Sequence, residues 1–177
     1  WSRGLGDVYK RQMDNTPIMN EKKHSRHGQY LSFELAHEFY GVDILQVQEI
    51  RGWQPVREVP DTPGFIKGVI DLRGVIVPVV DLRIRFGMEP AEYGTTTVVI
   101  IINVTGQESI HTVGIIVDTV SDVIDVDEAA VKAMPDLGTQ IHIDYIRGMA
   151  PGETMVMLLD VDKLLAPGEL SRLKLEN

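Results

Sequence analysis

Short runs rich in β-branched residues, broken by Gly, Pro and Asp, make up most of the chain from Gln29 onward. Val, Ile and Thr dominate these runs, and such residues favour the pleated, half-buried surface of a β-strand. The pattern predicts a mainly β protein with strands at Tyr30–Leu35, Glu38–Ile50, Gly68–Leu72, Val75–Val80, Thr96–Val104, His111–Asp125 and Thr154–Asp160.

Helical signals are few by comparison. Asp127–Met134 starts with Asp-Glu and is followed by Pro135, a combination typical of the two ends of a helix. Val161–Leu165 and Glu169–Leu175 are the other candidates. Because many short strands with closely spaced turn residues accompany so few helices, we expect an all-β fold of small barrels or a sandwich.

An internal repeat relates the two halves of the β-rich region. The matching segments, which follow one another in the same order in each half, are Gly41–Ile50 with Gly114–Val123, Phe65–Gly68 with Tyr145–Gly148, and Val79–Leu82 with Leu158–Val161. The repeat predicts two β-modules of about 70 to 80 residues, packed together because each is small for an independent core. We expect their boundary near residues 90–95, and Val47 and Val120 on equivalent strands.

The ends of the chain differ from this region in composition. Residues 1–12 mix Trp, Gly and basic residues without any period, so we interpret them as an assembly scar and Met13 as the natural start. Residues 13–28 are polar and predict a mobile N-terminal tail. A domain over residues 29–170 and a C-terminal tail over residues 171–177 complete the expected organisation.

Charge and composition exclude several classes of function. Lys and Arg number 17 against 26 Asp and Glu, for a net charge of −9, which argues against nucleic-acid binding. Cys is absent, which excludes disulfides, Fe–S clusters and a Cys nucleophile. The uninterrupted apolar runs are far shorter than the roughly 20 residues of a membrane-spanning helix, so we expect no direct membrane insertion.

Catalytic motifs do not assemble in this sequence. A nucleophile elbow, a P-loop and a dinucleotide glycine pattern are missing, so we predict no catalytic residue, no cofactor and no metal site. His142 and Asp144 share one face of a possible strand, although an exposed polar edge is the plainer interpretation. Asp71 and Asp81 each precede an Arg at a strand end, where a turn or an ion pair explains them. A small β-barrel enzyme using Asp71 or His142 remains the alternative from another class.

Two segments favour a protein contact. A strand over Val42–Arg51 mixes apolar and polar residues on both faces, which fits either a contact surface or burial between two modules. Asp71–Gly74 predicts a hairpin tip that carries Arg73 between two apolar strands. That guanidinium could form a bidentate contact with a partner carboxylate, and a solvated turn is the alternative.

Three long segments resemble the family of CheW-like chemotaxis coupling proteins. They are Tyr40–Gly52, Phe65–Leu82 and Val113–Val123, within a similarity that spans Gln29 to Leu165. The resemblance implies two intertwined SH3-like five-stranded β-barrels around a shared core, with a few short helices, which agrees with the repeat.

The same resemblance implies a non-enzymatic cytoplasmic adaptor recruited to membrane-associated receptor arrays. Its partners would be the cytoplasmic tip of methyl-accepting chemotaxis receptors and the regulatory domain of the chemotaxis histidine kinase. A coupling protein of another chemosensory pathway, such as one governing twitching motility, is the alternative within the family.

The resemblance also implies positions for the binding sites. The receptor-binding groove would be bordered by Ile44, Val47, Glu49, Gly68, Arg73, Val98 and Val99. Leu137 would lie in a loop that contacts the kinase or a neighbouring barrel. Leu45, Val47 and Glu49 form one strip, in which we expect Val47 to be substantially exposed. Asp71 stands where the family usually has Asn, so it either changes receptor binding or pairs with Arg73.

Overall fold

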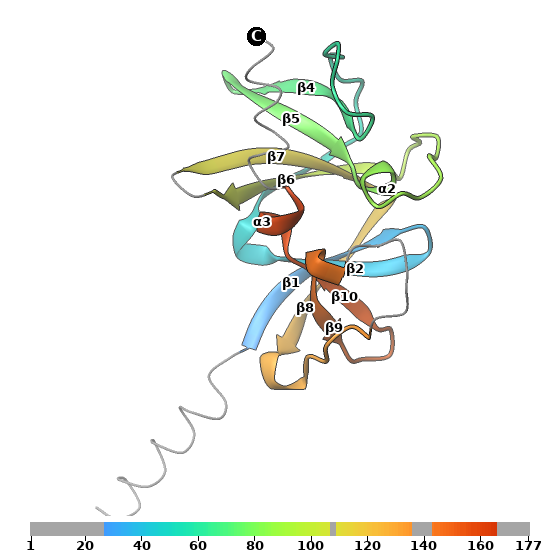
Figure 1. The fold of residues 1–177 in the computed structure, drawn as a ribbon, viewed down its shortest axis with the longest axis vertical. Coiled ribbons are helices and arrows are strands. Elements are labelled where there is room, and N and C mark those ends of the chain that lie inside the picture. The colour runs from blue at the N-terminus through green and yellow to red at the C-terminus, as the bar shows by residue number, and fades with distance from the viewer. Residues whose placement is uncertain (1–26, 107–108, 136–142, 166–177) are drawn as a thin grey trace, which may run out of the picture.

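Two five-stranded β-sheets make up the computed structural model, which describes residues 27–106, 109–135 and 143–165 (Figure 1). Sheet A has the strand order β8 (Thr119–Asp127), β1 (His27–Leu35), β2 (Glu38–Asp43), β10 (Val156–Leu159) and β9 (Ile146–Ala150). Sheet B has the order β3 (Val47–Gly52), β6 (Val98–Thr105), β7 (Ile110–Val117), β5 (Val75–Asp81) and β4 (Ile66–Leu72). The predicted all-β fold class is confirmed.

Helices in the described residues are limited to single turns. They are η1 (Ile44–Gln46), α2 (Leu82–Arg85), η2 (Glu128–Ala130), η3 (Ile143–Tyr145) and α3 (Val161–Leu164). The prediction of a helix from Val161 is confirmed, with the Asp160 carboxylate accepting the Lys163 N–H at its start. The prediction over Asp127–Met134 is wrong: after η2 the backbone pairs with β9, so no helix continues. Glu169–Leu175 lies outside the described residues.

Both of the longest predicted strands are divided between the two sheets. Glu38–Ile50 begins as β2 in sheet A, turns through η1 and continues as β3 in sheet B. His111–Asp125 begins as β7 in sheet B and, after Asp118, continues as β8 in sheet A. We call the point where the chain passes from one sheet to the other a crossover. Apolar residues continue on both sides of each crossover, so the sequence pattern does not reveal the change of sheet. The short strand β9 was also missed by the pattern.

The internal repeat is confirmed by the sheet topology. Strands β1–β5 correspond in order to β6–β10, and replacing each strand by its counterpart converts the order of sheet A into that of sheet B. Val47 lies on β3 and Val120 on the corresponding strand β8, and each strand has a register shift just after this residue. The segment 90–95 separates the two repeats along the chain, but each sheet takes strands from both repeats.

Each sheet curls so that its two edge strands approach. The chain that leaves β3 pairs back to β4 through a bridge between Arg57 and Val69, and the chain that leaves β8 pairs to β9 through Lys132 and Met149. Gly68 makes the first approach possible, because a Cβ there would lie 2.2 Å from the Arg57 carbonyl oxygen. The sheets therefore close into barrels, as expected from the resemblance.

The main hydrophobic core lies between the sheets and takes side chains from both. Phe33 and Tyr40 of sheet A and Ile100, Ile102 and Ile115 of sheet B are all 0% exposed. A smaller hydrophobic cluster fills the inside of each barrel. Because the largest cluster belongs to neither sheet alone, the two barrels share one core.

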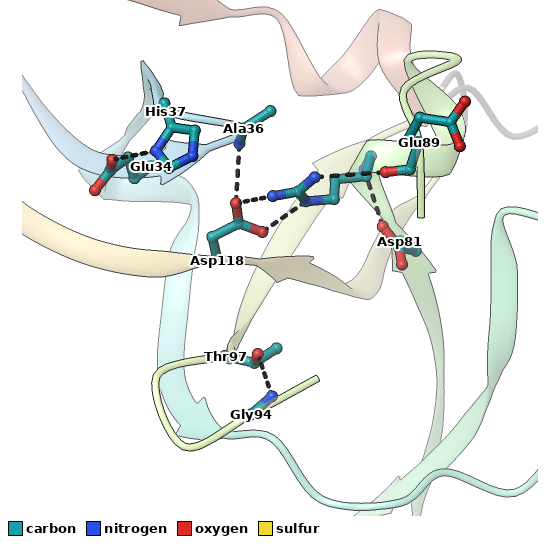
Figure 2. Close-up of polar contacts among 9 residues, drawn as sticks. Glu34, Ala36, His37, Asp81, Glu89, Gly94, Thr97 and Asp118 are labelled. Carbon is teal, nitrogen blue, oxygen red and sulfur yellow. Dashed lines mark hydrogen bonds and ion pairs between the residues drawn. The ribbon is translucent and has the colours of Figure 1, made fainter. Parts of the chain in front are cut away.

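A polar contact also ties the two sheets together beside this core (Figure 2). Arg83 of α2 donates from Nε and Nη2 to the two carboxylate oxygens of Asp118, at 2.8 and 2.5 Å, and Asp118 also accepts the N–H of Ala36 at 2.9 Å. We call these three residues the first clamp. Burial alone would raise the pKa of Asp118, but the hydrogen bonds from Arg83 and Ala36 outweigh it, so the pKa is lowered.

The repeat places a second clamp at the equivalent position. Asp162 of α3 accepts the N–H of Thr105 at 2.8 Å and the side-chain amide of Gln46 at 3.1 Å. In each clamp a short helix, a crossover and the turn between two strands meet at one carboxylate. The clamps therefore fix both crossovers relative to both sheets.

Candidate docking surface

The predicted hairpin tip is present between β4 and β5. Arg73 and Gly74 have φ angles of 52° and 88°, the left-handed conformation that a two-residue hairpin turn requires at its central positions. The Asp71 carboxylate accepts the Gly74 N–H at 2.7 Å and so stabilises the turn. Asp71 therefore bonds to its own turn, while Arg73 contacts a different carboxylate.

The side chain of Arg73 reaches from the hairpin tip to β3. Its Nη2 lies 3.0 Å from Oε2 of Glu49, and Nε of Arg51 lies 4.0 Å from the other carboxylate oxygen. The side chains of Arg73 and Glu49 are 74% and 24% exposed. An exposed ion pair of this kind contributes only about 0–1 kcal/mol to stability, so its main effect here is to orient the guanidinium.

The other residues predicted for this surface are less exposed. Ile44, Val47 and Val98 are half-buried and pack against the main core. The expectation that Val47 is substantially exposed is wrong, because Val47 pairs with Ile102 and turns toward the core. Leu45, two residues before Val47, is instead 88% exposed.

Gly68 and Val99 are buried and can shape the surface only from beneath. Gly68 permits the close approach of β4 to the Arg57 backbone. Val99 is 4% exposed and belongs to the cluster inside sheet B. A small cavity of about 30 Å³ reaches this cluster; its lining is Arg51, Gly52, Gln54, Val56, Ile70 and Val99.

Three exposed apolar side chains near the ion pair were not among the predicted residues. Ile50 on β3 is 47% exposed, and Val75 and Ile76, directly after the hairpin turn, are 56% and 63% exposed. The position of Val75 and Ile76 directly after a hairpin tip was a usable signal, since the first residues after a tight turn project beyond the sheet. Together with Leu45 they place apolar side chains on the segments around Arg73 and Glu49.

The remaining candidate residues do not form a site in the described residues. Leu137 and His142 lie outside the described residues. Asp81 is buried, accepts a hydrogen bond from the Tyr93 hydroxyl and starts α2 by accepting the Arg83 N–H. The pKa of Tyr93 is raised, mainly by burial and to a smaller extent by that hydrogen bond. Across residues 27–106, 109–135 and 143–165, no group of three or more His, Cys, Asp or Glu is arranged to hold a metal ion.

Perturbed groups elsewhere have structural explanations. Burial raises the pKa of Tyr40, in the main core, to about 12. Burial also raises the pKa of Tyr30 to about 12, although the charge of Arg147 acts in the opposite direction. Neither tyrosine lies on the surface around Arg73. A search of the described residues for helices long and apolar enough to cross a membrane finds none.

Exposed apolar side chains beside an oriented ion pair are typical of surfaces that bind other proteins. Residues 29–168 match the CheW-like domain, and the chain belongs to the CheW-like family.

Known relatives agree with this assignment. The chain is 44% identical over 144 residues to the chemotaxis protein CheW of Klebsiella aerogenes, covering 81% of this chain and 84% of that protein. It is 33% identical over 155 residues to the chemotaxis protein CheW of Rhizobium meliloti, covering 86% and 97%. The crystal structure of the scaffolding protein TtCheW from Thermoanaerobacter tengcongensis matches with a TM-score of 0.70 and 34% identity, covering 80% and 89%. The predicted family is confirmed, and the chain is a chemotaxis scaffold protein.

Proposed function

We propose that this scaffold protein couples methyl-accepting chemotaxis receptors to the chemotaxis histidine kinase, acts without catalysis, and works on the cytoplasmic side of membrane-associated receptor arrays. Membership of the CheW-like family supports this proposal, as do relatives that are themselves chemotaxis proteins. The regulatory domain of the kinase is the second partner in this proposal.

The contact between Arg73 and Glu49 is the observation that supports a receptor site here. A helical receptor tip would dock on an apolar strip flanked by a few charges, because apolar burial gives affinity and charges fix the register. Leu45, Ile50 and Val75 are exposed on the segments around this ion pair.

The predicted residues take different parts in this proposal. Ile44, Val47 and Val98 form the half-buried border of the strip, whereas Gly68 and Val99 support it from beneath. Leu137 stays a proposed contact to the kinase or to a neighbouring barrel.

A binding titration with a purified receptor signalling tip tests the receptor site. We expect Val47→Asp and Arg73→Glu each to weaken receptor binding by about 5- to 30-fold, which corresponds to about 1–2 kcal/mol for a contact of this importance. Leu45→Ser should also weaken binding, and its 88% exposure makes it the variant least able to disturb the fold. Met155→Ser is the matched control, since Met155 is 54% exposed on the β9–β10 hairpin of the other sheet.

Kinase binding provides a second readout on the same variants. Val47→Asp and Arg73→Glu should change it less than they change receptor binding, because we place the kinase contact elsewhere. Unchanged receptor affinity in both variants, with circular dichroism like that of the wild type, would place the receptor site on another surface. Repeating the titration with receptor tips of different chemosensory pathways, including one for twitching motility, identifies the pathway.

A further inference from the structure

An open cleft of about 620 Å³ is lined mainly by β8 and the β9–β10 hairpin of sheet A. Apolar side chains from the interior cluster of this sheet line it, namely Phe39, Ile124, Val126, Ala150 and Val156. Acidic residues also line it, and all four are exposed: Asp122, Asp125, Asp127 and Glu153. The cleft therefore combines an apolar floor with a negatively charged rim.

The internal repeat makes this cleft the counterpart of the surface around Arg73. Asp122 on β8 is equivalent to Glu49 on β3, and Glu153 lies at the tip of the β9–β10 hairpin as Arg73 lies at the tip of β4–β5. The charge pair of sheet B is thus replaced in sheet A by two carboxylates. Such a rim lacks the internal neutralisation of sheet B and favours a cationic occupant.

A cationic segment of the same chain directly precedes β1, whose neighbour β8 lines the cleft. Residues 22–26 read Lys-Lys-His-Ser-Arg, with three cations in five residues of a chain whose net charge is −9. This segment joins β1 at His27, which pairs with the cleft residue Asp127. Five extended residues span about 17 Å, enough to follow the rim of a cleft of this size.

We propose that the basic segment Lys22–Arg26 binds the acid-rimmed cleft of sheet A within the same molecule. The covalent connection at His27 gives the segment an effective concentration on the order of millimolar at the cleft, so weak charge pairs are sufficient for binding. Pro17-Ile-Met19, a few residues earlier, supplies apolar side chains for the floor.

Amide chemical shifts of the full chain test the proposal. The wild type is compared with the triple variant Lys22→Glu, Lys23→Glu, Arg26→Glu in 50 mM and in 500 mM NaCl. We expect shift differences at the cleft, for instance at Ile124 and Thr154, in low salt, and their loss in high salt because the charge pairs are exposed. Identical cleft shifts for both proteins in low salt would overturn the proposal.

A peptide of residues 13–26, added to the charge-reversed full chain, gives an independent measurement. It should bind with saturable shifts at the cleft, and replacing the rim by Asp122→Asn, Asp125→Asn and Glu153→Gln should weaken it at least about fivefold. The matched control is Glu58→Gln with Glu92→Gln, two exposed carboxylates outside the cleft. Equal weakening in the control, no saturable shift, or tighter binding of an unrelated Lys-rich peptide would each contradict the proposal. No receptor or kinase is needed, so the outcome is independent of the proposed coupling function.

Discussion

Removing the carboxylate of the first clamp should destabilise the fold far more than removing an exposed ion pair. Asp118→Ala deletes two hydrogen bonds from Arg83 and one from the Ala36 N–H. Hydrogen bonds to charged groups contribute about 1.5–3 kcal/mol when they are shielded from water. The side chains of Arg83 and Asp118 are 19% and 32% exposed, so solvent screening reduces their interaction. We therefore expect a loss of about 2 kcal/mol in the free energy of unfolding.

Urea unfolding followed by circular dichroism measures this loss. The midpoint should fall for Asp118→Ala without a change in the slope, since the surface exposed on unfolding stays the same. A double-mutant cycle with Arg83→Met should give a coupling energy of about 1–2 kcal/mol, in the range expected for residues in direct contact. Arg73→Gln is the matched control, because it removes an exposed ion pair and should cost less than about 0.5 kcal/mol. A loss for Asp118→Ala no larger than that of the control would refute the reasoning.

Three further predictions concern the same fold. Because the pKa of Asp118 is lowered in the folded state, its stabilisation is present above the unfolded value of about 4 and is lost as the pH falls. The unfolding free energies of wild type and Asp118→Ala should thus differ most near neutral pH and converge in acid. Gly68→Ala should lower the free energy of unfolding by about 3 kcal/mol, because the added Cβ clashes with the Arg57 carbonyl, and thermal unfolding measures this loss. Gly64 has open space around it, so Gly64→Ala should lower the same free energy by less than about 0.5 kcal/mol. Tyr40→Phe should stabilise the protein by about 1 kcal/mol in urea unfolding, since the buried Tyr40 hydroxyl has no hydrogen-bond partner among the described residues; a loss of stability would contradict this.

Strand positions could be predicted from the sequence, but the assignment of strands to sheets could not. The run Glu38–Ile50 is β-rich throughout, and the turn at η1 depends on the Asp43 carboxylate accepting the Leu45 N–H. An Asp within a strand is a weak turn signal on its own. The repeat did predict equivalent strands, because the matching segments occupy the same place in each sheet order.

The resemblance named both Glu49 and Arg73, but the sequence did not predict that they pair with each other. Glu49 and Arg73 both project from predicted strand or turn positions, and they meet as an ion pair. The prediction that Val47 is exposed was wrong because it assumed one continuous strand, in which side chains alternate between the two faces. The crossover at η1 interrupts that strand and restarts the alternation. Leu45 is exposed for the same reason, since it lies in the crossover itself.

The two crossovers give the chain the layout of a domain-swapped dimer whose two subunits have been fused. Each repeat begins in one sheet and ends in the other, so neither repeat contains a complete sheet. A polypeptide of one repeat alone could satisfy its edge strands only by exchanging them with a second copy. Cutting the chain near residues 90–95 should therefore give two fragments that reassociate into one folded unit, and the intact protein should unfold in a single step despite its two barrels.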